Sequence, residues 1–107
     1  MIAFEFLRRS GYKLLEKNYR VVLGEIDAVG EKDGRIIFFE VKTRSGTRFG
    51  APEEAVHEAK QRKIIRLAQW YLKENKMEGR AVSFAVVSVM LAGPSRPPEI
   101  RLIENAF

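Results

Sequence analysis

The sequence predicts one α/β domain, in which a mixed five-stranded sheet is combined with an N-terminal helix and one long helix. Two features indicate this class. The apolar pattern alternates between helical spacing and short strands in the order α-β-β-β-α-β-β, and no repeat or change of composition marks a second domain within residues 1–107. In addition, Asp33-Gly34 lies between two strand-like segments and is typical of a tight β-hairpin turn.

The first three strands follow a short helix. We expect that helix at residues 3–9, because Phe4 and Leu7 have helical spacing and Gly11 is suited to end a helix. Residues 12–22, 25–30 and 35–43 are expected to form the strands, although the apolar alternation in the first of them is irregular.

A long helix and two further strands complete the expected order. Pro52 suits the first helical position, and the helix should continue to about Asn75. The valine-rich segment 81–91 is expected to be a buried strand, and 99–103 an edge strand after a proline-rich turn. The helix should bury a stripe formed by Val56, Ala59, Ile64, Leu67, Ala68, Tyr71 and Leu72.

The composition restricts the function. With no cysteine in the chain, disulfides, zinc–thiolate sites and cysteine nucleophiles are excluded. The formal net charge of +5 suits a polyanionic partner such as nucleic acid, although a mildly basic surface also occurs without such a role. The first residues do not resemble a secretory signal and no apolar run is long enough to span a bilayer, so the expected location is the cytoplasm.

The hairpin between residues 24 and 44 carries the candidate chemistry. If residues 33 and 34 form the turn, counting back along both strands places Asp27 opposite Glu40, and Glu25 opposite Lys42. Side chains that are directly opposed, or two apart on one strand, share a face of the sheet. The count therefore predicts one charged cluster made of Glu25, Asp27, Glu40 and Lys42.

These residue types suit metal-dependent cleavage of a phosphodiester. Two opposed carboxylates beside an apolar strand destabilise a hairpin unless a cation compensates them, and Mg²⁺, with Mn²⁺ as an alternative, prefers such oxygen ligands. We expect Asp27, Glu40 and Lys42 to be catalytic, with Lys42 positioning or helping to deprotonate the attacking water, or stabilising charge that grows on the phosphate. Glu25 is either a third metal ligand or the salt-bridge partner of Lys42. The alternative for the whole cluster is a surface salt-bridge lattice, and the number of metal ions stays open.

Further basic residues are candidates for contacts with backbone phosphates. Such contacts give salt-dependent affinity without sequence specificity. The alternative is a solvated helix face. His57 is expected at the surface without a catalytic role, and Trp70 is expected to pack. The candidate phosphate contacts are Arg44, Arg48, Lys60 and Lys63.

Together these residues resemble a known family. Asp27 followed by Glu40-Val41-Lys42 on the next strand is similar to the active-site pattern of the PD-(D/E)xK nuclease superfamily, which includes restriction endonucleases and Holliday-junction resolvases. Over nearly its whole length, the chain resembles the YraN-like family of predicted endonucleases. The matching stretches are Gly11-Tyr12, Asn18-Tyr19-Arg20, Gly24-Glu25-Ile26-Asp27, Phe39 to Arg44, Phe49-Gly50 with Pro52, Lys60 and Asn105-Ala106-Phe107.

The resemblance implies a restriction-endonuclease-like sandwich and a Mg²⁺-dependent nuclease acting on DNA, branched DNA included. Junction-cutting relatives work as dimers, which makes a homodimer the favoured assembly, although the oligomeric state stays open. Family members usually have a Gly-Glu pair ahead of the first helix, with its glutamate near the metal. This sequence lacks that pair, and Glu5 follows Ala3 instead of preceding it. The competing hypothesis is therefore a non-catalytic nucleic-acid-binding module on the same fold.

Overall fold

The computed structural model describes residues 2–45 and 57–107. Its elements have the predicted order, and their boundaries differ from the predicted ones by at most two residues wherever both ends are described. The elements are α1 (Ile2–Arg9), β1 (Lys13–Val21), β2 (Gly24–Lys32), β3 (Arg35–Ser45), α2 (Glu58–Glu74), β4 (Val82–Leu91) and β5 (Glu99–Ile103). The predicted helix start at Pro52 lies outside the described residues.

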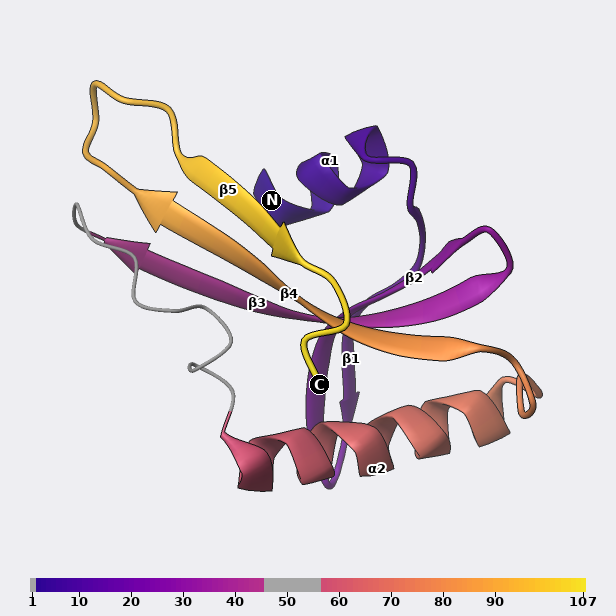
Figure 1. Ribbon diagram of the computed structural model, residues 1–107. Helices are drawn as coiled ribbons and strands as arrows, with labels where there is room; N and C mark the ends of the chain where they lie inside the picture. The colour runs from indigo at the N-terminus through magenta and orange to yellow at the C-terminus, as the bar shows by residue number, and fades with distance from the viewer. Residues whose placement is uncertain (1, 46–56) are drawn as a thin grey trace.

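The five strands form one mixed sheet in the order β1-β2-β3-β4-β5, as Figure 1 shows. Strands β3 and β4 are parallel, and every other neighbouring pair is antiparallel. In the chain, α2 lies between the two parallel strands, which is the usual way to join such strands. The predicted α/β class with a mixed five-stranded sheet is therefore confirmed.

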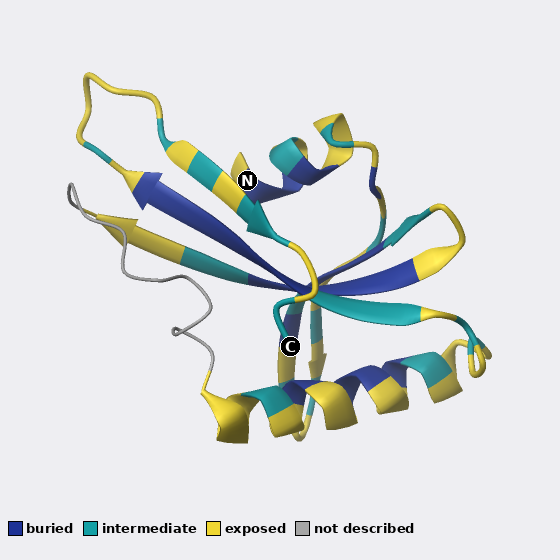
Figure 2. Cartoon of the chain, in the orientation of Figure 1, coloured by how far each residue is buried: buried dark blue, intermediate teal, exposed yellow. Residues whose placement is uncertain are grey.

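Helix α1 covers one face of the sheet and α2 covers the other. On β3, Ile37 and Phe39 belong to the core cluster that includes Phe4 and Leu7 of α1. Ile36 and Phe38 are buried on the opposite face, in the cluster that includes Leu67 and Tyr71 of α2. Strand β3 is therefore buried on both faces, as its continuous apolar run predicts, and Figure 2 shows its central part in dark blue.

The buried stripe of α2 is narrower than predicted. Ile64, Leu67, Ala68 and Tyr71 are buried, and Leu72 is partly buried. Ala59 is exposed, and Trp70 is 49 % exposed, so both predictions of packing are wrong. Trp70 lies a hundred degrees around the helix from Tyr71, which places its side chain beyond the stripe. Val56 lies outside the described residues.

The sheet is continuous at one end and open at the other. Strands β2 and β3 pair from Lys32–Arg35 to Ala28–Phe39, in the register counted from the turn. Beyond that point, β2 stays with β1 as far as Gly24, whereas β3 stays with β4 as far as Ser45. In Figure 1, β1 and the start of β2 run down toward α2, away from β3 and β4. We call this opening between β2 and β3 the fork.

No helix in the described ranges 2–45 and 57–107 is both long enough and apolar enough to cross a membrane.

Candidate active site

Asp27 lies at the base of the fork and holds a main-chain group of the opposite strand. Its Oδ2 accepts a hydrogen bond of 2.7 Å from the backbone N–H of Val41. In a continuous ladder that N–H would donate to a backbone carbonyl of the neighbouring strand. The Asp27 carboxylate takes the place of this carbonyl, so the sheet opens without leaving the Val41 N–H unpaired.

The direction of β2 changes at the same residue. Ala28 is buried in the cluster on the α1 face, and Ile26 is buried in the cluster on the α2 face. Residues two apart on a regular strand share a face, so β2 must turn about its own axis at Asp27. The turn lets the start of β2 follow β1 toward α2 while β3 continues with β4.

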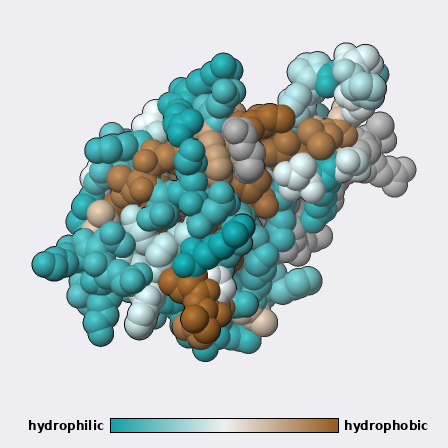
Figure 3. Space-filling model, turned by 180° about the vertical axis from the view of Figure 1, so that it is seen from behind, coloured by the Kyte–Doolittle hydropathy of each residue, from teal (hydrophilic) through white to brown (hydrophobic). Residues whose placement is uncertain are grey.

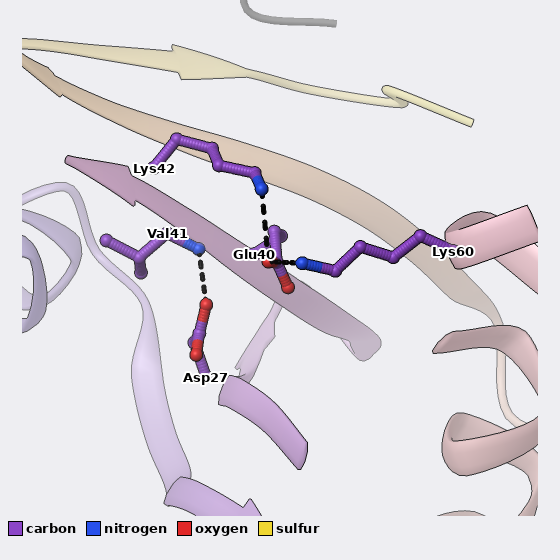
Figure 4. Close-up of polar contacts among 5 residues, drawn as sticks. All are labelled: Asp27, Glu40, Val41, Lys42 and Lys60. Atoms are coloured by element: carbon purple, nitrogen blue, oxygen red, sulfur yellow. Dashed lines mark hydrogen bonds and ion pairs between the residues drawn. The ribbon is translucent and has the colours of Figure 1, made fainter. Parts of the chain in front are cut away.

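Glu40 is the buried acid of the site. It is only 8 % exposed and follows the apolar run of β3 on the face covered by α2. Its Oε1 lies 2.6 Å from Nζ of Lys60, which reaches down from the first turn of α2. The same oxygen lies 3.7 Å from Nζ of Lys42, two residues further along β3. Figure 4 shows both ammonium groups directed at Glu40 from different elements, with the Asp27–Val41 hydrogen bond beside them.

Burial shifts the proton affinities of these groups. Desolvation raises the pKa of the Asp27 carboxyl, and the negative charges of Glu40 and Glu25 raise it further, while the Val41 N–H and Lys60 partly offset the shift. Desolvation also lowers the pKa of the Lys42 ammonium, and the neighbouring positive charge of Lys60 adds to this effect. The hydrogen bond to Glu40 raises the pKa of Lys60. Lys42 is therefore the lysine of this site that releases a proton more readily.

The carboxylates at the fork suit a cation that takes some of its ligands from water and from the substrate. Asp27 and Glu40 offer carboxylate oxygens, and Mg²⁺ commonly binds one or two carboxylates together with water and phosphate oxygens. Within residues 2–45 and 57–107, no group of three His, Asp or Glu side chains lies close enough together to hold a metal ion. The described residues thus fit a Mg²⁺ ion that is completed by water and substrate, and they do not form an all-protein cage.

Comparison with known proteins places the chain in a family. The family model described as "Uncharacterised protein family UPF0102" matches residues 1–89, which include Asp27, Glu40, Lys42 and Lys60. The chain belongs to this family. A UPF0102 protein of Symbiobacterium thermophilum is 47% identical over 105 residues, covering 98% of this chain and 88% of the relative. A second, of Syntrophomonas wolfei, is 46% identical over 107 residues, covering 99% and 90%. A third, of Persephonella marina, is 43% identical over 88 residues, covering 82% and 76%.

In this UPF0102 protein, Glu25 does not join the charged cluster that the sequence predicts with Asp27, Glu40 and Lys42. Glu25 was expected opposite Lys42, but its Oε2 lies 3.1 Å from Nε of Arg20, its partner across the β1–β2 ladder. The counted register fails here because β2 has already left β3 before Glu25 is reached. The partner of Lys42 is Glu40 instead. Glu25 therefore acts on Asp27 through its charge, and it is not gathered with Asp27 and Glu40 as a third carboxylate.

The basic residues predicted to contact phosphates do not form one group in the structure. Lys60 lies in the site itself, in the ion pair with Glu40. Lys63, one turn further along α2, lies over Gly24 at the start of β2. Arg44 is exposed near the end of β3, and its charge contributes to the lowered pKa of Lys42. Arg48 lies outside the described residues. His57 is exposed, as predicted.

Two contacts of the UPF0102 site were not predicted from the sequence. The first is the hydrogen bond from Val41 to Asp27, for which the sequence contains no signal because it forms only where the strands part. The second is the Lys60–Glu40 ion pair. A signal for the latter exists, since Lys60 precedes the buried Ile64 by four residues and therefore lies on the same side of α2.

Proposed function

We propose that this protein is a divalent-cation-dependent nuclease of the PD-(D/E)xK type that hydrolyses phosphodiester bonds in nucleic acid, DNA in particular. The observation that carries the proposal is the fork, where two carboxylates and a lysine with a lowered pKa meet at the end of a buried strand. The mixed sheet with one helix on each face is compatible with a restriction-endonuclease-like sandwich.

The roles of the residues follow from their environments. Asp27 and Glu40 would hold the cation, which when bound supplies polarisation of a phosphate oxygen and a lowered pKa of its water. In its neutral amine form, which the pKa lowered by burial and by Lys60 favours, Lys42 would accept a proton from the water that attacks phosphorus. The bond from phosphorus to the leaving oxygen breaks, and that oxygen takes up a proton from solvent, while Lys42 returns its proton to solvent. Lys60 pairs with Glu40 at 2.6 Å and would offset its negative charge between turnovers.

The same geometry supports one alternative. Oε1 of Glu40 lies 2.6 Å from Nζ of Lys60 and 3.7 Å from Nζ of Lys42, and the charge of Lys60 also acts on Asp27. Two lysines therefore offset the two carboxylates without any metal. A site that is already neutral can be a structural salt-bridge network. In that case the chain would be a nucleic-acid-binding module without catalysis, as the competing sequence hypothesis states.

Cleavage and metal binding should be measured on the same variants. The full chain is incubated with a labelled pool of single strands, duplexes, flaps and four-way junctions, with Mg²⁺, with Mn²⁺ or with EDTA. Metal binding is measured in parallel by calorimetry. We expect Asp27→Asn and Glu40→Gln each to reduce the cleavage rate by roughly 100-fold or more, because each replaces a negatively charged carboxylate that would hold the cation by a neutral amide.

Glu99→Gln is the matched control, since it removes an exposed acid on β5 whose ion-pair partner is Arg101. It should leave cleavage unchanged. Cleavage that persists in the Asp27→Asn/Glu40→Gln double variant would refute the nuclease proposal. Nucleic-acid binding without metal binding, and without any effect of these substitutions, would establish the alternative.

A further inference from the structure

The turn between β1 and β2 projects two apolar side chains into solvent. Val22 is fully exposed and Leu23 is 64 % exposed, the largest exposures among the large apolar residues of the described chain. Figure 3 views the molecule from behind and shows a brown projection at the bottom, at the place of this turn in Figure 1, surrounded by teal. We call Val22 and Leu23 the tip.

The chemistry of tight turns does not explain these two residues. The tip is a two-residue connection, because Val21 and Gly24 form the last pair of the β1–β2 ladder. Such connections favour glycine, asparagine and aspartate, which tolerate positive φ or bond to their own backbone. Neither tip residue has a positive φ, which this turn places at Gly24 (φ 151°), and neither packs into a core cluster. The backbone therefore tolerates Val22 and Leu23 but does not require them. The tip therefore contributes nothing evident to folding, and its two apolar side chains are available for a partner.

The hairpin holds the tip rigidly against α2. A Cβ added to Gly24 would lie 2.8 Å from Cε of Lys63 and 3.2 Å from Cδ1 of Leu67, so the turn packs tightly on the helix. Further along β1, the ring of Tyr19 meets the ring of Tyr71 edge-on at 5.1 Å, and the Tyr19 hydroxyl donates to Glu74. A rigid projection loses little conformational entropy when it enters a partner.

Positive charge surrounds the tip. Leu23 lines a hollow of about 140 Å³ together with Lys63, Arg66 and Leu67. No ion pair among the described residues engages Lys63 or Arg66. An apolar projection between unpaired cations fits a partner with a negatively charged backbone and an apolar interior. Nucleic acid has both properties, and proteins that kink it insert such side chains between bases while cations contact the phosphates.

We propose that the tip is a wedge that enters an unstacked base step of a nucleic acid, with Lys63 and Arg66 on the flanking phosphates. The inference rests on the proposed function in that it takes nucleic acid as the ligand, and it adds a substrate class, namely strands with a base step that is mismatched, nicked or unpaired. Leu23 precedes Asp27 by four residues, which span roughly 13 Å at about 3.3 Å per residue of extended chain. The opened step should therefore lie about four nucleotides from the cleaved bond, at about 3.4 Å per nucleotide.

The test uses duplexes that carry the fluorescent base 2-aminopurine at a mismatch, at a nick or in fully paired sequence. The Glu40→Gln protein is used with EDTA, so that unstacking is measured without cleavage. We expect fluorescence to rise at the mismatch and at the nick, and the Val22→Ser/Leu23→Ser variant to abolish this rise. The preference for mismatched over paired duplex should fall by roughly 10-fold, the loss expected when an apolar side chain of this size is no longer buried in the partner.

Two matched controls accompany this variant. Leu91→Ser removes an exposed apolar residue at the end of β4. It should change neither the fluorescence rise nor the preference for mismatched duplex. Lys63→Gln/Arg66→Gln should weaken binding to all duplexes and reduce the slope of log affinity against log salt by about 2, whereas Lys73→Gln in the last turn of α2 should not. Because Val22 and Leu23 are exposed, the Val22→Ser/Leu23→Ser variant should melt like the parent protein.

The outcomes separate this inference from the nuclease proposal. Unstacking by the tip without metal-dependent cleavage in the wild type would refute the nuclease proposal and support the wedge. Cleavage that is indifferent to Val22→Ser/Leu23→Ser would refute the wedge alone. The wedge would also be overturned if the substitutions changed only the oligomeric state in solution, or only the binding to anionic phospholipid vesicles. Absence of any nucleic-acid binding would overturn both.

Discussion

The two turns at the ends of β2 are built in opposite ways. The β2–β3 turn has Asp33 at φ 52° and Gly34 at φ 77°, the residue types and the left-handed conformation that a two-residue hairpin favours. The β1–β2 turn has Val22 and Leu23, a β-branched and a large apolar residue, both without positive φ and both exposed. One turn follows the rules of local structure, and the other departs from them.

The strands beside each turn show the same contrast. Next to Asp33-Gly34, the β2–β3 ladder continues without a break for five pairs. Toward the other turn, β2 leaves β3, and a carboxylate replaces a backbone carbonyl at Asp27. Departures from local rules that persist in a folded protein are found mainly at functional sites. The comparison therefore favours the Val22–Leu23 end of β2 as the site of the proposed function, and it places the local folding signals at the Asp33–Gly34 end.

The largest expected difference comes from replacing one lysine at the fork and, separately, one lysine beside the Asp33–Gly34 turn. Lys42→Gln removes the ammonium with the lowered pKa at the fork, and we expect cleavage to fall by roughly 100-fold to 1,000-fold, as for the loss of a proton-transfer group. Lys32→Gln removes a lysine beside the other turn, whose Nζ donates to the Ser10 carbonyl at 2.8 Å. It should lower stability slightly and leave the cleavage rate per folded molecule unchanged. The cleavage rates of both variants are measured on the substrate that the wild type cleaves fastest. An equal loss of rate in the two variants would contradict the contrast.

The two turns should also differ in how much they contribute to stability. Gly34→Ala forces a Cβ into positive φ where no other atom lies within 4 Å, so only backbone strain acts. The free energy of unfolding should fall by about 1–2 kcal/mol, a drop in melting temperature of roughly 4–8 °C or more for a domain of this size.

At the other turn, Val22→Asn/Leu23→Gly introduces favoured turn residues and is expected to leave the melting temperature unchanged or raise it slightly. Thermal denaturation by circular dichroism measures both variants. A large loss of stability in the second variant would show that Val22 and Leu23 are needed for folding.

The sequence predicts the Asp33–Gly34 half of the sheet well, because the turn fixes a register that each further pair repeats. It predicts that Asp27 and Glu40 approach each other for the same reason. The sequence prediction fails at Glu25. Counting residues from the turn assumes that β2 and β3 stay paired, whereas β2 continues beside β1 and β3 continues beside β4. The turn of β2 at Asp27 depends on packing against α2, which no local pattern encodes. The pairing of Lys60 with Glu40 has a partial signal, since Lys60 precedes the buried Ile64 by four residues, but its partner could not be read from the sequence.

The smallest expected effect is a gain of stability at the fork. The raised pKa of Asp27 means that the folded protein binds a proton at this carboxyl more tightly than the unfolded chain, whose ordinary value is 3.8. The stabilising contribution of the protonated form is complete below that value, and it is lost as the pH rises through the higher pKa of the folded state. Without a divalent cation, the ionised carboxylate thus destabilises the folded protein at neutral pH.

Asp27→Asn removes that charge while its amide oxygen can still accept the Val41 N–H. In EDTA at about pH 7, we expect its melting temperature to exceed that of the wild type by roughly 2–5 °C, a difference that shrinks toward zero at about pH 3. Asp33→Asn at the other turn is the matched control, since asparagine also suits the left-handed conformation, and it should show no such pH-dependent gain. A lower melting temperature for Asp27→Asn at neutral pH would mean that the charge of Asp27 stabilises the fork. Asp27 would then be a structural residue, like those at the Asp33–Gly34 end.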